Sequence, residues 1–206
     1  MAGLASGMGN ARAPLSERKD DLYETPPVAV RALLSVEPVP LTVWEPACGP
    51  GAIVRELRAT GRAVIATDLV DYGCPDSIAR RDFLMELSGP EGVPAIVTNP
   101  PFKLAMQFAA HARHLVPQVY MLLRLAFLES ESRRSILDEG DLARVWVFRK
   151  RLPFMHRHGY DGPKHSNSGM AFAWFVWDRE HQGPTTLSRL SWEAFAQQPE
   201  VLEPAP

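Results

Sequence analysis

The sequence has little cysteine, no long apolar run and no excess of positive charge. Its only cysteines are Cys48 and Cys74, too few for a disulfide framework, so a reducing, cytoplasmic compartment is expected. The longest apolar run, which ends at Trp177, is far too short to cross a bilayer. The net charge of −2 gives no global positive field. These shortages argue against a disulfide-stapled secreted domain and a membrane protein, and they leave nucleic-acid binding to a local basic segment.

The length of the chain fits one domain. A chain of 206 residues can bury a complete core. Residues 1–21 are small, polar and patternless, which predicts a flexible N-terminal tail. The Pro-rich end predicts that a C-terminal extension, 181–206, is partly disordered. Residues 22–180 therefore form the expected folded domain.

Short β-rich runs alternate with helical patterns through this domain. We expect strands within 42–47, 63–69, 94–99, 118–128, 143–150 and 170–178, and helices within 26–36, 52–61, 103–116 and 130–140. Such alternation predicts a mostly parallel sheet covered by helices on both faces. The last two strands have no helix between them, so their pairing should be antiparallel.

A glycine turn lies between the first strand and the helix that follows it, in WEPACGPGA (44–52). Gly49 and Gly51 permit a turn that a Cβ would obstruct and let a ligand approach the backbone. Asp68 ends the next strand, where a carboxylate can accept both hydroxyl protons of a ribose. A tight turn with a purely structural role is the alternative interpretation.

Glu45 immediately precedes that turn. A carboxylate there suits a cationic ligand and would repel a pyrophosphate. A ligand with a ribose and an ammonium group, such as S-adenosylmethionine (SAM), therefore fits better than NAD or ATP. The alternative is a helix-capping or surface carboxylate.

A second motif, IVTNPPF (96–102), ends an apolar run with Asn99, Pro100, Pro101 and Phe102. Together with EPACGPG (45–51), it resembles the paired signature of class I SAM-dependent methyltransferases that act on amino groups. It is most similar to the phage and bacterial N6-adenine DNA methyltransferases, whose fourth motif is Asn/Asp-Pro-Pro-Tyr/Phe. The likeness covers Tyr23 to Asp178. It implies a Rossmann-like fold, with a mostly parallel seven-stranded sheet that contains one antiparallel strand.

The resemblance assigns a catalytic role to the four residues of the second motif. The side-chain oxygen of Asn99 and the carbonyl of Pro100 would each accept one hydrogen of an exocyclic amine. This would aim the nitrogen lone pair at the methyl donor. Pro101 would keep the turn rigid, and Phe102 would stack on a flipped base. A strand terminator with a core Phe is the alternative.

Further positions match the family more loosely. YETPP (23–27) resembles the segment before the first motif, with Tyr23 and Thr25 beside the methionine part of SAM, although Thr25 could simply cap a helix. In RDFL (81–84), Asp82 would bind the adenine amine of SAM and Phe83 its ring, unless Asp82 is an ordinary loop residue. The implied SAM-binding residues are Tyr23, Thr25, Glu45, Pro46, Ala47, Gly49, Gly51, Asp68, Asp82 and Phe83.

The segment 148–169 is the only basic block of the chain and carries interleaved aromatic residues. Such a block suits phosphates and bases, and a solvated loop is the alternative. The expected substrate contacts are Arg149, Arg151, Arg157, Tyr160 and Lys164. Its histidines lack cysteine partners, so no metal site is expected.

The expected function is methyl transfer from SAM to N6 of adenine in DNA. The chain has no room for a separate target-recognition domain, so the basic block, a partner or a homodimer would supply sequence selectivity. Methylation of an RNA base or of a protein glutamine is the alternative within the same chemistry. A catalytically silent nucleoside-binding module is an alternative from another class.

Overall fold

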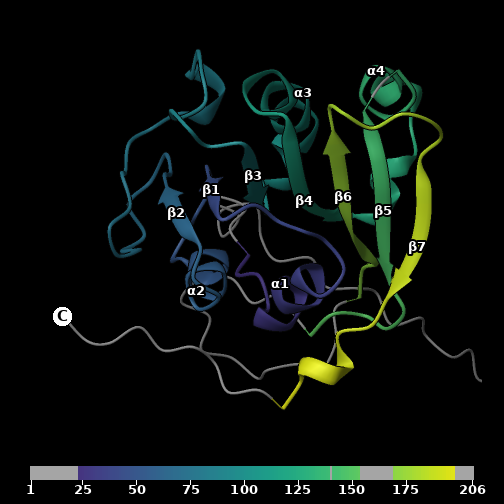
Figure 1. Cartoon of the computed structure of the whole chain (residues 1–206), viewed down its shortest axis with the longest axis horizontal. Coiled ribbons are helices and arrows are strands. Elements are labelled where there is room, and N and C mark those ends of the chain that lie inside the picture. Colours follow the sequence, from purple (N-terminus) through teal and green to yellow (C-terminus); the bar gives the residue numbers. More distant parts are fainter. Residues whose placement is uncertain (1–22, 140, 154–168, 198–206) are drawn as a thin grey trace, which may run out of the picture.

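The computed structural model describes residues 23–139, 141–153 and 169–197. The expected tail, 1–21, lies outside the described residues. A seven-stranded sheet in the order β2-β1-β3-β4-β6-β5-β7 forms the centre of the molecule (Figure 1). Its strands are β1 (Thr42–Glu45), β2 (Ala63–Ala66), β3 (Ala95–Thr98), β4 (Gln118–Arg124), β5 (Leu142–Phe148), β6 (Phe172–Asp178) and β7 (Thr186–Leu190).

The sheet is mostly parallel, as the alternating pattern predicts. β1 pairs in parallel with β2 and β3, β3 with β4, and β5 with β7. β6 runs antiparallel to both of its neighbours, β4 and β5. The expected antiparallel pairing of the last two predicted strands is therefore confirmed, and β6 is the single antiparallel strand.

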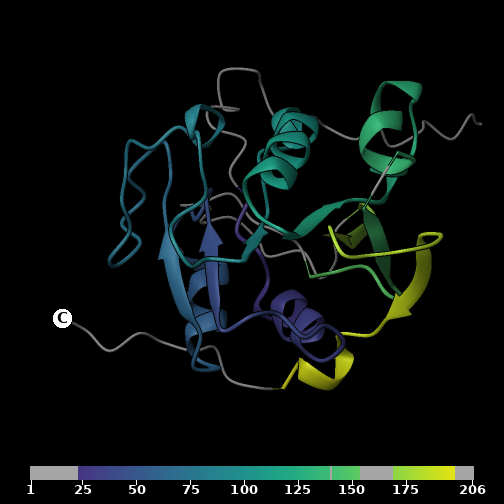
Figure 2. The ribbon, with the colours of Figure 1, turned by 45° about the horizontal axis from the view of Figure 1, so that its top comes forward.

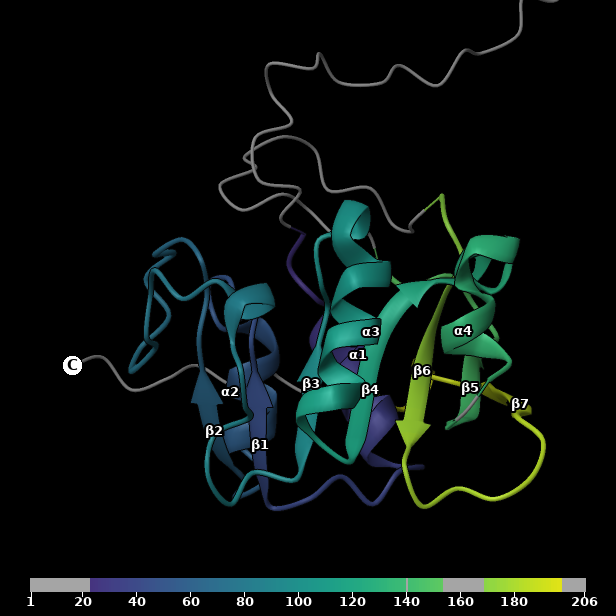
Figure 3. The same cartoon turned by 90° about the horizontal axis from the view of Figure 1, so that it is seen from above.

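Helices cover both faces of the sheet, as expected. The α-helices of the described residues are α1 (Pro27–Leu34), α2 (Ala52–Arg58), α3 (Ala105–Leu115) and α4 (Arg134–Leu137). Figures 2 and 3 show α1 and α2 on one face and α3 and α4 on the other. Within the described ranges, no helix combines the length and the apolar character that crossing a membrane requires.

Two apolar cores follow from the alternation of side chains along the strands. In β4, Tyr120 and Leu122 join the core beneath α1 and α2, whereas Met121 and Leu123 join the core beneath α3. A strand that is buried on both faces reads as a continuous apolar run. The apolar run within 118–128 therefore predicts β4 from the sequence alone.

The sheet continues past residue 180, the predicted end of the folded domain. β7 forms its last strand and pairs with β5 in register from Arg144 to Phe148. Leu190 is 4% exposed, and Trp192 just beyond it is also buried in the core beneath α1. The sequence does not predict β7 because it is an edge strand: apart from Leu190 its side chains are mostly exposed, so it shows no apolar run.

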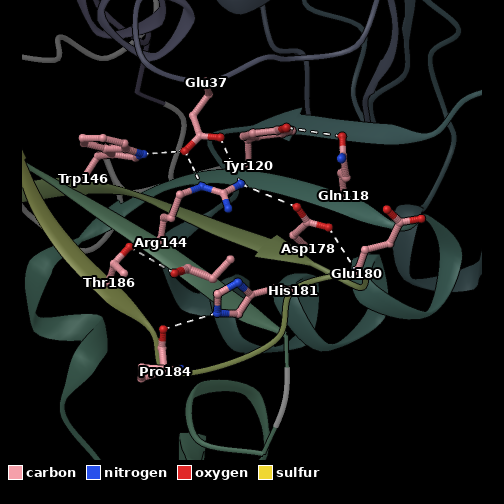
Figure 4. Close-up of polar contacts among 11 residues, drawn as sticks. Glu37, Gln118, Tyr120, Arg144, Trp146, Asp178, Glu180, His181, Pro184 and Thr186 are labelled. Atoms are coloured by element: carbon pink, nitrogen blue, oxygen red, sulfur yellow. Dashed lines mark hydrogen bonds and ion pairs between the residues drawn. The ribbon is translucent and has the colours of Figure 1, made fainter.

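A polar network ties the segment after α1 to β5 and β6 (Figure 4). The Glu37 carboxylate accepts from Arg144 Nε at 2.6 Å and from Trp146 Nε1 at 2.6 Å. Arg144 also lies 3.6 Å from Asp178. Because Asp178 pairs with Gln118, the first residue of β4, this network lies at the amino ends of the parallel strands.

Candidate active site

The predicted motifs meet at the opposite edge of the sheet, where the parallel strands end. The register aligns Glu45, the last residue of β1, with Ala66, the last residue of β2. It also aligns Thr98, the last residue of β3, with Met121 in the middle of β4, which extends three residues further to Arg124. The glycine turn, Asp68 and the Asn-Pro-Pro-Phe segment all follow these ends. In open α/β sheets this is the edge where ligands bind.

The glycine turn has the backbone that its sequence predicts. Gly49 and Gly51 have φ angles of 53° and 88°, in the left-handed region that glycine adopts without strain. A Cβ on Gly51 would lie 2.8 Å from Sγ of Cys74. The backbone N–H of Gly49 donates to Asp68 Oδ2 at 2.8 Å, so the acid after β2 holds the turn after β1 in place.

Glu45 is buried, so it is neither the surface carboxylate nor the helix cap of the alternative interpretation. Its Oε1 accepts from Thr98 Oγ1 at 2.6 Å and from the backbone N–H of Ala47 at 3.1 Å. Its Oε2 is buried and has no hydrogen-bond partner among the described residues. Burial raises the pKa of the carboxyl well above its ordinary value, and the bonds from Thr98 and Ala47 oppose this only in part.

Asn99 is held by its amide nitrogen. Nδ2 donates to the carbonyl oxygen of Tyr23 at 3.2 Å and to Thr25 Oγ1 at 3.0 Å. A carbonyl oxygen only accepts, so the amide group that faces Tyr23 must be the NH₂. The side-chain oxygen, Oδ1, is left buried and without a hydrogen-bond partner among the described residues.

Thr25 does not cap the helix that it precedes. The N-cap of α1 is Pro26, and no side chain makes a capping bond there. Thr25 is 4% exposed and accepts from Asn99 instead. The segment before the first motif thus fixes the orientation of an amide 74 residues away along the chain.

A small pocket opens between the glycine turn and Asn99. Its lining combines the segment before α1, the turn after β1, the start of α2 and the end of β3. The lining residues are Tyr23, Glu24, Thr25, Ala47, Cys48, Gly49, Pro50, Ala52, Ile53 and Asn99. Four of the ten predicted SAM-binding residues line this pocket, namely Tyr23, Thr25, Ala47 and Gly49, and the predicted catalytic residue Asn99 lines it with them.

Asp82 and Phe83 are not among the residues that line this pocket. Asp82 is exposed and accepts from the backbone N–H of Leu84 at 3.0 Å, which caps a short 3₁₀ helix. Phe83 is 2% exposed and packs in the core against Trp44 and Phe108. Asp82 thus caps a short 3₁₀ helix and Phe83 packs in the core, and their contacts with the adenine of SAM stay a prediction.

Phe102 is half-buried among other side chains, and its stacking on a base stays a prediction. Its ring stacks on Tyr23, with centroids 5.4 Å apart, and contacts Phe172 at 5.8 Å. The guanidinium of Arg124, the last residue of β4, lies 4.2 Å from the Phe102 centroid. Sequence analysis missed Arg124, whose only signal is a charged residue at the end of an apolar strand.

The predicted substrate residues are only partly described. Arg149 and Arg151 are exposed and follow β5 at the same edge as Arg124, because Val147 and Leu123 both pair with Ala173. Arg157, Tyr160 and Lys164 lie outside the described residues.

No family model and no curated protein matches the sequence. Solved structures do resemble this protein. A modification subunit of a type I restriction enzyme from Vibrio vulnificus YJ016 has a TM-score of 0.52 and 15% identity, over 84% of this chain and 48% of its own. An RNA methyltransferase from Pyrococcus horikoshii has a TM-score of 0.53 and 18% identity, over 76% and 87%. A class I SAM-dependent methyltransferase from Listeria monocytogenes has a TM-score of 0.52 and 11% identity, over 80% and 62%.

These likenesses establish the fold. The chain spans about half the length of the Vibrio vulnificus subunit. At identities below one fifth, what is shared is the arrangement of strands and helices. The protein therefore has the Rossmann-like fold of class I methyltransferases, with the single antiparallel strand that the sequence predicts.

Proposed function

We propose that this protein transfers a methyl group from SAM to an exocyclic amine, and that the amine is N6 of adenine in DNA. The observation that carries the proposal is the amide of Asn99. Its nitrogen donates to Tyr23 and Thr25, and its oxygen is buried beside the pocket with no partner in the described ranges. Buried polar atoms in folded proteins are nearly always hydrogen-bonded, so an unpaired one calls for a ligand or another explanation.

The residues around the pocket fit SAM. The left-handed Gly49 and Gly51 bring the backbone close to the pocket, and Asp68 lies at the turn, where a ribose would be bound. Glu45 is the last residue before the turn, and a cationic group beside its Oε2, which has no partner among the described residues, would stabilise the charged form. Tyr23 and Thr25 complete the wall of the pocket.

The chemistry needs few protein groups. SAM supplies an electrophilic methyl group attached to a sulfonium. An aromatic amine is a poor nucleophile because its lone pair is delocalised into the ring. Asn99 Oδ1 accepts one amine hydrogen and the Pro100 carbonyl accepts the other, which favours a tetrahedral nitrogen whose lone pair points away from the ring. Because Asn99 is fixed before the substrate arrives, little reorganisation is needed in the transition state.

The test is Asn99→Ala. It should lower kcat by a factor on the order of 10²–10³, the usual loss when one preorganised hydrogen-bonding group is removed. The affinity for SAM should change by less than about tenfold, because the acceptor acts chiefly in the transition state. Gln118→Ala is the matched control, since Gln118 carries the same amide at the opposite edge of the sheet. A kcat near that of the wild type in Asn99→Ala would contradict the mechanism.

The substrate is tested by offering DNA, RNA and glutamine-containing peptides with labelled SAM. Mass spectrometry of the digested products should find N6-methyladenine from the DNA. Label in RNA or in a glutamine side chain, with none in DNA, would replace adenine in DNA by that substrate. A protein that binds SAM but labels none of the three would be the silent binding module.

A further inference from the structure

A second pocket borders Phe102 and shares no lining residue with the first. It has a volume of about 190 Å³, room for several water molecules at roughly 30 Å³ each. Its polar groups are two guanidinium groups, from Arg124 and Arg133, and none of its lining residues is acidic. The rest of the lining is apolar and includes Phe102 and Phe127.

Each arginine lies over an aromatic ring. The Arg124 guanidinium carbon is 4.2 Å from the Phe102 centroid, and that of Arg133 is 4.7 Å from the Phe127 centroid. These contacts hold both planar groups in place, because a ring face attracts a cation. Arg133 is further fixed by donating from Nη1 to the carbonyl oxygens of Ala126 and Phe127.

Neither arginine has a counter-charge among the described residues. Nε of Arg124 and Nε of Arg133 are buried and lack hydrogen-bond partners. Other part-buried arginines of the chain do pair with a carboxylate: Arg31 with Glu56 at 2.6 Å, and Arg144 with Glu37 at 2.6 Å. A buried donor without an acceptor costs about 1–3 kcal/mol, and more when it is charged.

We propose that Arg124 and Arg133 form a binding site for a phosphodiester group of the substrate. Two fixed guanidinium groups match the oxygens of a phosphate better than any neutral group. The inference rests on the proposed function, in which the reacting amine lies at Asn99. Every base of a nucleic acid has a phosphate close by in the backbone, whereas a protein glutamine is flanked by neutral peptide groups. The pocket therefore favours a nucleic acid over a protein.

The experiment measures how binding of single strands of about 12 nucleotides depends on salt between about 50 and 200 mM. Mixed-sequence DNA and RNA are the probes, with S-adenosylhomocysteine present. Arg124→Gln should reduce the slope of log K against log salt by about 0.7, the value for one phosphate contact on a single strand. Arg62→Gln is the control and should leave the slope unchanged. Arg62 immediately precedes β2, the strand at the far side of the sheet, and its guanidinium donates to the Val39 carbonyl. Comparing the DNA and RNA arms identifies the polymer that uses the site.

Arg124→Lys separates charge from packing. It keeps the positive charge, so it should retain most of the slope even if affinity falls. An equal loss of slope in the Lys and Gln variants would mean that Arg124 acts by packing on Phe102, and would overturn the proposal. So would an unchanged slope in Arg124→Gln, or failure of the wild type to bind either oligonucleotide.

Failure of the phosphate site can be distinguished from failure of the proposed function. Methyl transfer to adenine together with an unchanged slope in Arg124→Gln would remove the phosphate site alone. A slope that depends on Arg124 in a protein that transfers no methyl group would remove the proposed reaction alone.

Discussion

Two side-chain oxygens at one sheet edge, Glu45 Oε2 and Asn99 Oδ1, are buried without a hydrogen-bond partner in the part of the chain that the structure describes. In both residues the other polar atom is tied down by neighbouring elements: Thr98 donates to Glu45, and Thr25 accepts from Asn99. Each group is therefore fixed in orientation while one atom stays available. Such arrangements lower the cost of binding, because the protein has already lost the freedom that a ligand would otherwise remove.

The raised pKa of Glu45 predicts a pH dependence of stability. The folded protein holds this proton more tightly than the unfolded chain does, whose value is near 4.5. The contribution of Glu45 to stability is thus complete below pH 4.5 and is lost as the pH rises toward the folded pKa. Glu45→Gln resembles the protonated form at every pH, so it should become progressively more stable than the wild type as the pH rises. Urea unfolding across this range measures the difference.

Binding of SAM offers a second test of the protonation state of Glu45. A cationic group beside Oε2 would lower the pKa of Glu45, so SAM binding should release a proton in the wild type and not in Glu45→Gln. Calorimetry in two buffers of different ionisation enthalpy detects this release. Parallel stability curves for the two proteins, with no proton release, would show that Glu45 is already charged in the free protein.

At the scale of elements, the Glu37 network joins three segments that are distant in sequence. The Glu37 side chain is 1% exposed and accepts hydrogen bonds from Arg144 and Trp146 on β5. Figure 4 shows these groups converging from the segment after α1 and from β5. Its position at the amino ends of the strands separates it from the candidate active site.

Glu37→Gln should lower the free energy of unfolding by about 2 kcal/mol, because it removes charged hydrogen bonds from a buried site. Chemical denaturation measures the change. Glu193→Gln is the control: the Glu193 side chain is 55% exposed and pairs with Lys150, so the loss there should stay below about 1 kcal/mol. Methyl transfer well below the unfolding midpoint should be unaffected in both. Equal losses in the two variants would mean that the network adds nothing beyond a surface ion pair.

For the whole molecule, the segment after residue 180 completes the fold. β7 covers the edge of β5, and Leu190 and Trp192 close the core beneath α1. Trp192 Nε1 also donates to the Lys150 carbonyl at 3.1 Å, which ties this segment to the end of β5. Without it, a strand edge and part of the core would face water.

A chain that ends at residue 180 should therefore lose cooperative unfolding and bind the dye ANS, which reports exposed apolar surface. A chain that ends at residue 197 keeps every described contact and is the control. Circular dichroism melting and dye fluorescence compare the two. Indistinguishable melting curves would restore the domain boundary at residue 180.

Much of this protein can be derived from local sequence. The alternation of strands and helices follows from apolar periodicity, and the left-handed turn follows from Gly49 and Gly51, because such patterns depend on neighbouring residues alone. The placement of Asn99 at the ligand-binding edge also follows, because the carboxyl ends of parallel strands share one edge.

The tertiary structure decides which distant groups meet. Thr25 is 74 residues from Asn99 and Thr98 is 53 residues from Glu45, so no local pattern predicts that one pair orients an amide and the other holds a buried acid. Packing of α1 and β3 against β1 creates both contacts. The contact between the Arg124 guanidinium and the Phe102 ring is also a tertiary contact, because it requires β4 to lie beside β3 in the sheet. The sequence determines the elements and their ends, and the order of the strands determines the chemistry that those ends can carry out together.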